Sequence, residues 1–161
     1  MAENIHNIKA SGMQNIRPKI MMGVVVWIML QLPRFVAVPI MQDVLNGIDS
    51  PAWLFPAILD IIVAITAPFV AFLIWRKRGL GIWMLGILFF VVSIVDHLDA
   101  ATAGLIAPAP RIFAGSNSGS NIIIPVLQMT LDIIALIILT RPRITSYYLA
   151  SDNSVDSLSK K

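Results

Sequence analysis

The chain contains no cysteine, and charged residues make up only 13% of its 161 positions. Without cysteine there can be no disulfide bond, thiolate metal site or cysteine nucleophile. A soluble domain is usually about 25% charged, so this chain has too little charge to cover a water-facing surface. Disorder over most of the chain is also excluded, because 57% of the residues are hydrophobic. We therefore expect the excess apolar surface to face lipid.

Several function classes have no support in the sequence. The formal net charge is only +3, and the basic residues sit beside apolar runs, so we expect no nucleic-acid partner. We find no serine–histidine–acid arrangement, no phosphate-binding glycine loop and no HExxH zinc motif. The sequence names no cofactor, and it leaves open whether the protein is an enzyme.

Four long apolar stretches define the expected fold. A helix needs roughly 20 apolar residues, at ~1.5 Å each, to cross a ~30 Å hydrocarbon core. The pattern predicts an all-α integral membrane protein, an antiparallel bundle of four transmembrane helices, with the lipid bilayer as its partner. The expected spans are 20–44, 51–75, 79–106 and 122–140. The first stretch is too long for the apolar region of a cleaved signal peptide, so we expect it to be retained.

The basic residues predict the orientation of this bundle. Three lie in residues 1–19, three at 76–78 and four at 141–161, which places ten of the twelve on one side of a four-span arrangement. By the positive-inside rule, both termini are cytoplasmic and the protein resides in the cell membrane. The expected domains are an N-terminal tail (1–19), a membrane domain (20–143) and a disordered C-terminal tail (144–161).

The connections differ in length. The turns at 46–50 and 76–78 are short, so the helices that they join are antiparallel neighbours. The third connection, 107–121, begins with an Ala-Pro-Ala-Pro sequence and continues rich in glycine and serine. Such a loop is either a passive linker or an external lid over a site, and the sequence leaves both interpretations open.

Ionisable residues inside the expected spans are the strongest functional signal. Each costs at least ~2.5–3.5 kcal/mol at mid-bilayer, so they require partners. Counted from the outer ends of the spans, one charge in each helix lies at a similar depth, about 13–15 Å at ~1.5 Å per residue. These four are Arg34, Asp60, Asp96 and Asp132. We expect every helix to contribute one charge to a common layer near the midplane.

Helical periodicity supports a polar interior. Small residues follow the face of Asp60, and Asp96 and Asp99 lie three residues apart on a face that also carries Ser93. In the first span, Gln31, Arg34 and Gln42 are expected on one face. Pro33 and Pro39 should kink that span near Arg34. His97 projects about 100° away from Asp96 along the helix, which argues against a shared pocket.

The expected site is acidic. Four carboxylates face one guanidinium, so some must hold protons, bind a cation or be reached by water. The candidate ion- or proton-binding residues are Asp60, Asp96, Asp99, Asp132 and His97, with His97 as a relay. Arg34 is interpreted as the charge-balancing group, with an anchor for an anionic ligand as the alternative. Gln31 and Gln128 complete the expected polar pocket. No metal is specified, since His97 is the only histidine in the spans.

Three functions remain in competition. The first is a membrane protein that binds or conducts a cation or protons, with coupling to solute transport as an option. The second is an accessory subunit of a larger membrane complex, and the third is a membrane enzyme that acts on a lipid or isoprenoid by carboxylate acid chemistry. Four helices are few for a transporter, which favours a homo-oligomer. The location of the polar faces, inside one chain or pointing outward, separates the first function from the second.

Overall fold

All regular elements of the described chain are helical. The computed structural model describes residues 18–113 and 120–150, and these ranges contain no strand. The elements in chain order are α2 (Ile20–Met29), η1 (Leu32–Val36), α3 (Ala37–Leu45), η2 (Pro51–Trp53), α4 (Leu54–Arg76), α5 (Leu80–Ile106), η3 (Arg111–Phe113), α6 (Ser120–Thr140) and α7 (Pro142–Leu149). The all-helical fold class predicted from the sequence is confirmed for the described residues.

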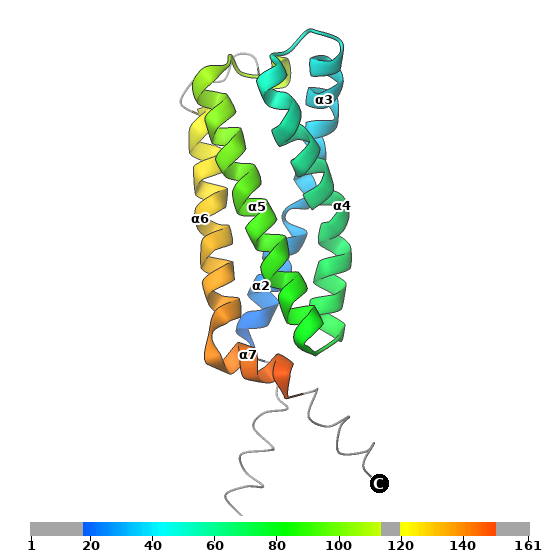
Figure 1. Ribbon diagram of the computed structural model, residues 1–161, viewed down its shortest axis with the longest axis vertical. Coiled ribbons are helices and arrows are strands. Elements are labelled where there is room, and N and C mark those ends of the chain that lie inside the picture. Colours follow the sequence, from blue (N-terminus) through cyan, green and yellow to red (C-terminus); the bar gives the residue numbers. More distant parts are fainter. Residues whose placement is uncertain (1–17, 114–119, 151–161) are drawn as a thin grey trace, which may run out of the picture.

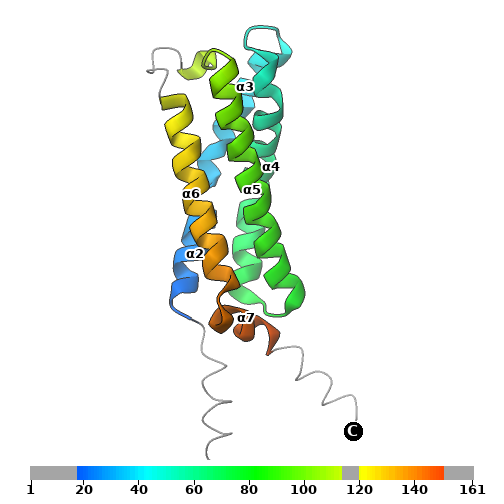
Figure 2. The ribbon, with the colours of Figure 1, turned by 60° about the vertical axis from the view of Figure 1, so that its left-hand side comes forward.

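Four helical segments are long and apolar enough to cross a membrane, as expected. They are Ile20–Leu45, Pro51–Arg76, Leu80–Ile106 and Ile122–Thr140, and each end lies within one residue of the range expected from hydropathy. The segments stand side by side along the long axis of the molecule, and α7 lies across one end (Figures 1 and 2). Of the long helices, α5 packs against both α4 and α6.

The first segment is interrupted where the two prolines predict a kink. Helix α2 ends at Met29, a tight 3-10 turn follows over Leu32–Val36, and α3 begins at Ala37. Pro33 has no N–H and cannot continue the α-helical hydrogen bonding back to Met29. The tighter turn takes up the break, and it places Arg34 inside the bundle.

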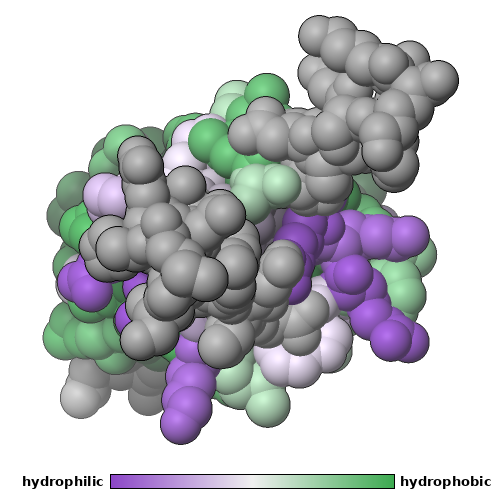
Figure 3. All heavy atoms as spheres, turned by 90° about the horizontal axis from the view of Figure 1, so that it is seen from below, coloured by the Kyte–Doolittle hydropathy of each residue, from purple (hydrophilic) through white to green (hydrophobic). Residues whose placement is uncertain are grey.

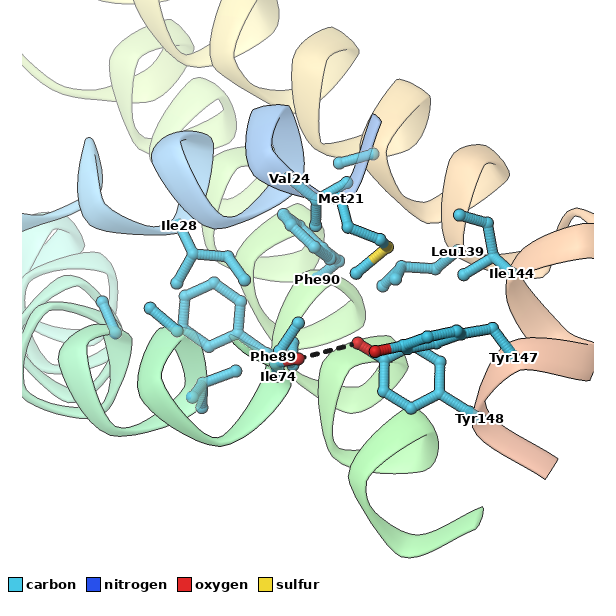
Figure 4. Close-up of a cluster of buried hydrophobic side chains, with 14 of the residues drawn as sticks. Met21, Val24, Ile28, Ile74, Phe89, Phe90, Leu139, Ile144, Tyr147 and Tyr148 are labelled. Atoms are coloured by element: carbon cyan, nitrogen blue, oxygen red, sulfur yellow. Dashed lines mark hydrogen bonds between the residues drawn. The ribbon is translucent and has the colours of Figure 1, made fainter. Parts of the chain in front are cut away.

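Two apolar clusters fill the ends of the bundle. The larger lies toward α7 and includes Ile28, Val63, Phe90 and Ala135 (Figure 4 shows its centre). The smaller lies toward η2 and η3, and it consists of Ala37, Ile40, Val44, Trp53, Ala57 and Ala103. Between the two clusters, the buried residues of the first and third segments are polar, and half-buried Asp60 lies at this level in the second. The polar layer thus lies between two regions of apolar packing.

Helix α7 departs from the sequence-based expectation. The tail was expected to be disordered from residue 144, but Ile144, Tyr147 and Tyr148 are buried in the larger apolar cluster. The Tyr148 hydroxyl donates to the carbonyl oxygen of Ile74 at 3.0 Å (Figure 4). The turn at Gly79, which adopts a positive φ of 117°, donates its N–H to Tyr148 at 3.1 Å. Residues 151–161 and residues 1–17 lie outside the described residues.

The end of the molecule that carries α7 is basic. Viewed from this end, hydrophilic side chains gather around the base of the helices (Figure 3). The exposed basic residues of these segments are Lys19, Arg76, Lys77, Arg141 and Arg143. Arg78 is partly buried, because its guanidinium lies over the ring of Tyr147, 4.1 Å from the centroid. The opposite end of the described bundle carries Asp43, Asp49 and a single basic residue, Arg111.

Candidate functional site

The guanidinium of Arg34 is the centre of the polar layer. The residue is 5% exposed, and α4 and α5 each contribute an acidic partner. Its Nη1 donates to Asp96 Oδ2 at 2.5 Å and to Asp60 Oδ1 at 3.2 Å. Its Nε donates to the side-chain oxygen of Gln31 at 2.7 Å, one turn earlier in the same segment. Arg34 therefore joins the first segment to α4 and α5 through ion pairs.

A second set of partners surrounds Asp132 on α6. Its Oδ1 accepts from the indole of Trp27 at 2.7 Å and from the amide of Gln31 at 3.0 Å. Its Oδ2 accepts from the Ser93 hydroxyl at 2.6 Å and lies 3.6 Å from Nη2 of Arg34. Through these bonds, the fully buried Asp132 ties α6 to α2 and α5.

Ser93 and His97 complete the network from α5. The Ser93 hydroxyl accepts from Nη2 of Arg34 at 2.6 Å, and Nε2 of His97 is in contact with the same nitrogen. The same Nε2 lies 3.3 Å from Oδ2 of Asp132, so the imidazole stands between the guanidinium and this carboxylate. Nδ1 of His97 forms no hydrogen bond to any described residue. The expectation that His97 points away from the pocket is therefore wrong, because its ring reaches Arg34 from the neighbouring turn.

Two polar residues from the expected site lie elsewhere. Asp99 forms no hydrogen bond or ion pair with any described residue, although it is one turn beyond Asp96, and its Oδ2 is buried without a partner. Gln42 is exposed near the end of α3, away from Arg34. Of the carboxylates expected in the layer, the structure brings Asp60, Asp96 and Asp132 together and leaves Asp99 outside.

A cavity of about 460 Å³ adjoins the network on the side away from α7. Twelve of its sixteen lining residues are apolar: Leu30, Pro33, Val36, Ile40, Trp53, Pro56, Ala57, Ala100, Pro110, Phe113, Ile124 and Pro125. The other four are Arg34, Asp60, His97 and Gln128. Among the three carboxylates of the network, Asp60 is the one that reaches this cavity, and its side chain is 25% exposed. The cavity therefore has a polar wall and an apolar body.

The first part of the 107–121 connection closes the far side of the cavity. Pro110 and Phe113 belong to its lining. The indole of Trp53 donates to the carbonyl oxygen of Pro108 at 2.9 Å. Arg111 donates its backbone N–H to Asp49 at 3.0 Å, and its Nε lies 3.3 Å from Asp43. Of the two interpretations of this connection, residues 107–113 therefore resemble a lid, and residues 114–119 lie outside the described residues.

Sequence reasoning missed Trp27 as a member of the network. Trp27, Gln31 and Arg34 follow the i, i+4, i+7 spacing of one helical face, and this spacing was a usable signal. An aromatic residue in an apolar run is ordinarily interpreted as packing, and its indole N–H becomes informative only once Asp132 is placed beside it.

The network is not a metal site by its composition. No group of three or more histidine, cysteine, aspartate or glutamate side chains is arranged to hold a metal ion within residues 18–113 and 120–150. The three carboxylates instead surround Arg34. Comparison with family models, with curated proteins and with solved structures finds no match. The class defined by the fold is thus an all-helical chain with four helices of membrane-spanning length, and its function has to be inferred from the site itself.

Proposed function

We propose that this chain is a four-helix membrane protein that binds protons at the Arg34 network and couples this binding to a small solute in the adjoining cavity. The polar layer would then be a proton site in the middle of the membrane. The cavity, which shares Arg34, Asp60 and His97 with the network, would be the solute site. Transport of the solute follows if the cavity opens in turn to the two sides of the membrane.

Two features support a location in the membrane: the apolar surface of the long helices and the different charges at the two ends of the bundle. The long helices expose large apolar side chains along their length, such as Phe69, Leu88 and Ile123, which are more than half exposed. The α7 end is basic, which favours that end in the cytoplasm. On this proposal the segments form an antiparallel bundle, with both termini on the cytoplasmic side and residues 107–121 on the other.

The single observation that carries the proposal is the charge of the buried layer. Three carboxylates contact one guanidinium, so the layer would carry two excess negative charges if all three carboxylates were ionised and His97 were neutral. An excess of two negative charges is very costly in a low-dielectric interior. Asp132 has donors on both oxygens, whereas Asp96 buries an oxygen with no hydrogen-bond partner and shares Nη1 of Arg34 with Asp60. Protons on Asp60 and Asp96 would remove the excess.

The same geometry weighs against the other two functions. The polar side chains of the network meet inside one chain and bond to one another, which favours a site within the chain over a contact with a partner subunit. An enzyme that acts on a lipid or isoprenoid would need an apolar tunnel open to lipid beside Asp96 or Asp99, and neither residue lines the cavity. Asp60 does line it, but Arg34 holds this carboxylate at 3.2 Å.

The proposal is tested by infrared titration of the purified protein without any solute. Protonated carboxylic acids have a C=O stretch that ionised carboxylates lack, so buried protons are counted directly as the pH is changed. We expect the wild type to show a carboxylic band at neutral pH, and the band to be reduced in Asp60→Asn and in Asp96→Asn. Asp99→Asn is the matched control, because it removes a carboxylate from the same helix outside the network.

Either of two outcomes would overturn the proposal. The first is the absence of a carboxylic band at neutral pH, which would mean that the network carries its full negative charge. The second is a band that only Asp99→Asn removes, which would place the proton outside the Arg34 network.

A further inference from the structure

We propose that the cavity beside Arg34 takes an amphipathic organic cation, whose charge contacts Asp60 and displaces a proton from the network. This inference rests on the proposed function, because it names the class of solute that the cavity would bind. It is carried by the lining of the cavity, by the position of Asp60 and by the unpaired polar groups that face the cavity.

The shape and lining of the cavity select an apolar molecule. Its 460 Å³ suits a small organic compound, and most of the lining is aliphatic, aromatic or proline. Trp53 and Phe113 lie at the lid side of the cavity, opposite the network. A hydrated inorganic ion would leave this apolar wall without contacts, whereas the hydrocarbon groups of an organic compound would fill it.

The sign of the charge follows from the polar wall. Asp60 is half-buried and has one oxygen on Arg34. Arg34 itself is buried and makes its hydrogen bonds to Gln31, Asp60, Asp96 and Ser93, so it has little donor capacity left for an anion. The groups that face Asp60 from the neighbouring elements are Arg34 from η1, Asp96 and His97 from α5 and Asp132 from α6. The wall itself has one guanidinium and one carboxylate, but the donors of Arg34 are already used and Asp96 and Asp132 lie behind it, so a positive charge beside Asp60 is favoured over a negative one.

The unpaired groups provide a second, independent observation. His97 is 3% exposed and lines the cavity, yet its Nδ1 forms no hydrogen bond within the described chain. The Gln128 amide also lines the cavity and likewise has no hydrogen bond to a described residue. His97 is buried and Gln128 is half-buried, and polar groups in such positions are usually satisfied by protein, water or a ligand. These two groups point to a ligand or to water beside Asp60.

Charge exchange follows from this arrangement. A cation beside Asp60 supplies the positive charge that a proton supplies in its absence, so the two compete for the same carboxylate. One proton displaced for each cation bound makes the affinity rise by about tenfold for each pH unit over the range in which the site is protonated. The cation therefore binds more tightly as the pH rises.

The experiment measures equilibrium binding of radiolabelled tetraphenylphosphonium to the detergent-purified chain. Tetraphenylborate, an anion of the same shape, controls for apolar partitioning. We expect saturable binding of the cation, at least about tenfold weaker in Asp60→Asn, unchanged in Asp99→Asn, and a pH slope near one proton. Ala100→Phe places a phenyl ring in the cavity and keeps the four polar residues unchanged, so it should abolish binding, whereas Ala101→Phe, at a position that does not line the cavity, should not.

Each contrary outcome has a distinct meaning. Equal binding of tetraphenylborate, or unchanged cation binding in both Asp60→Asn and Ala100→Phe, overturns the inference. No binding of tetraphenylphosphonium, in protein that still shows its carboxylic band, overturns the inference and leaves the proton site in place. Binding that depends on Asp60 without any pH slope upholds a cation cavity but contradicts the coupling to protons in the proposed function.

Discussion

Asp60 and Asp96, on different helices, share a single nitrogen of Arg34. Nη1 lies 3.2 Å from one carboxylate and 2.5 Å from the other. The two acids therefore compete for one donor, whereas Asp132 has an indole, an amide and a hydroxyl to itself. This difference separates Asp132, which ties helices together, from the two carboxylates that bind protons in the proposed function.

Replacement of Arg34 should cost more stability than any other single change in the polar layer. Arg34→Leu leaves three carboxylates in a buried layer without their cation, and we expect the free energy of unfolding to fall by about 3–5 kcal/mol at neutral pH. The loss should shrink as the pH falls, because protonated carboxylates no longer need the guanidinium. Reversible unfolding in mixed detergent micelles measures both effects.

Arg111→Leu is the control for this prediction. Its side chain is 65% exposed, and its ion pair with Asp43 is open to solvent, so its removal should cost under about 1 kcal/mol. Equal losses for the two variants would mean that Arg34 is no more than another surface charge.

The indole of Trp27 should contribute through its hydrogen bond. Trp27→Phe retains an aromatic ring but removes the N–H that donates to the buried Asp132 carboxylate at 2.7 Å. Hydrogen bonds to charged groups contribute about 1.5–3 kcal/mol, so a loss in this range is expected in the same unfolding assay. Trp83→Phe is the matched variant, because the Trp83 indole donates at 2.9 Å to a neutral carbonyl, that of Leu139. Its loss should be about 0.5–1.5 kcal/mol, and the opposite order would contradict the role given to Asp132.

The sequence was sufficient for the helices and for much of the polar layer. Long apolar runs have few alternative structures in lipid, so hydropathy located each of the four segments closely. Depth counting along those segments found Arg34, Asp60, Asp96 and Asp132, since residues equally far from helix ends lie at one level. The prolines similarly predicted the break beside Arg34.

The sequence could not predict in the same way which side chains of a helix point toward Arg34. Asp96 and Asp99 share a helical face within about 60°, but only Asp96 faces Arg34, because the tilt of α5 against its neighbours decides which residue is closer. His97 was misjudged because only its angle to Asp96 was considered: Ser93, Asp96 and His97 follow the i, i+3, i+4 spacing of one helical face, and all three contact Arg34. The helix α7 is short and flanked by polar residues, so its burial depends on tertiary contacts that periodicity does not reveal.

The packing of α7 against the end of the bundle should depend on Tyr148. Tyr148→Phe removes the hydroxyl that donates to Ile74 and should lower the free energy of unfolding by about 1 kcal/mol. Tyr148→Ala also removes a ring that is 1% exposed in the larger apolar cluster, and about 3–5 kcal/mol is expected. Proteolysis of the purified protein near residues 141–150 should follow the same order. Equal, negligible losses in both variants would show that α7 does not stabilise the bundle.

The proposed orientation can be tested without altering any native cysteine, because the chain has none. Asn46→Cys places a thiol in the exposed turn after α3, and Lys77→Cys places one in the exposed turn after α4, at the basic end. In intact cells a membrane-impermeant maleimide should label Cys at position 46 and leave position 77 unlabelled until the membrane is permeabilised. The unsubstituted chain should give no signal under either condition. Labelling of position 77 alone in intact cells would invert the orientation, since the basic end would then face outward, against the charge asymmetry on which it is based.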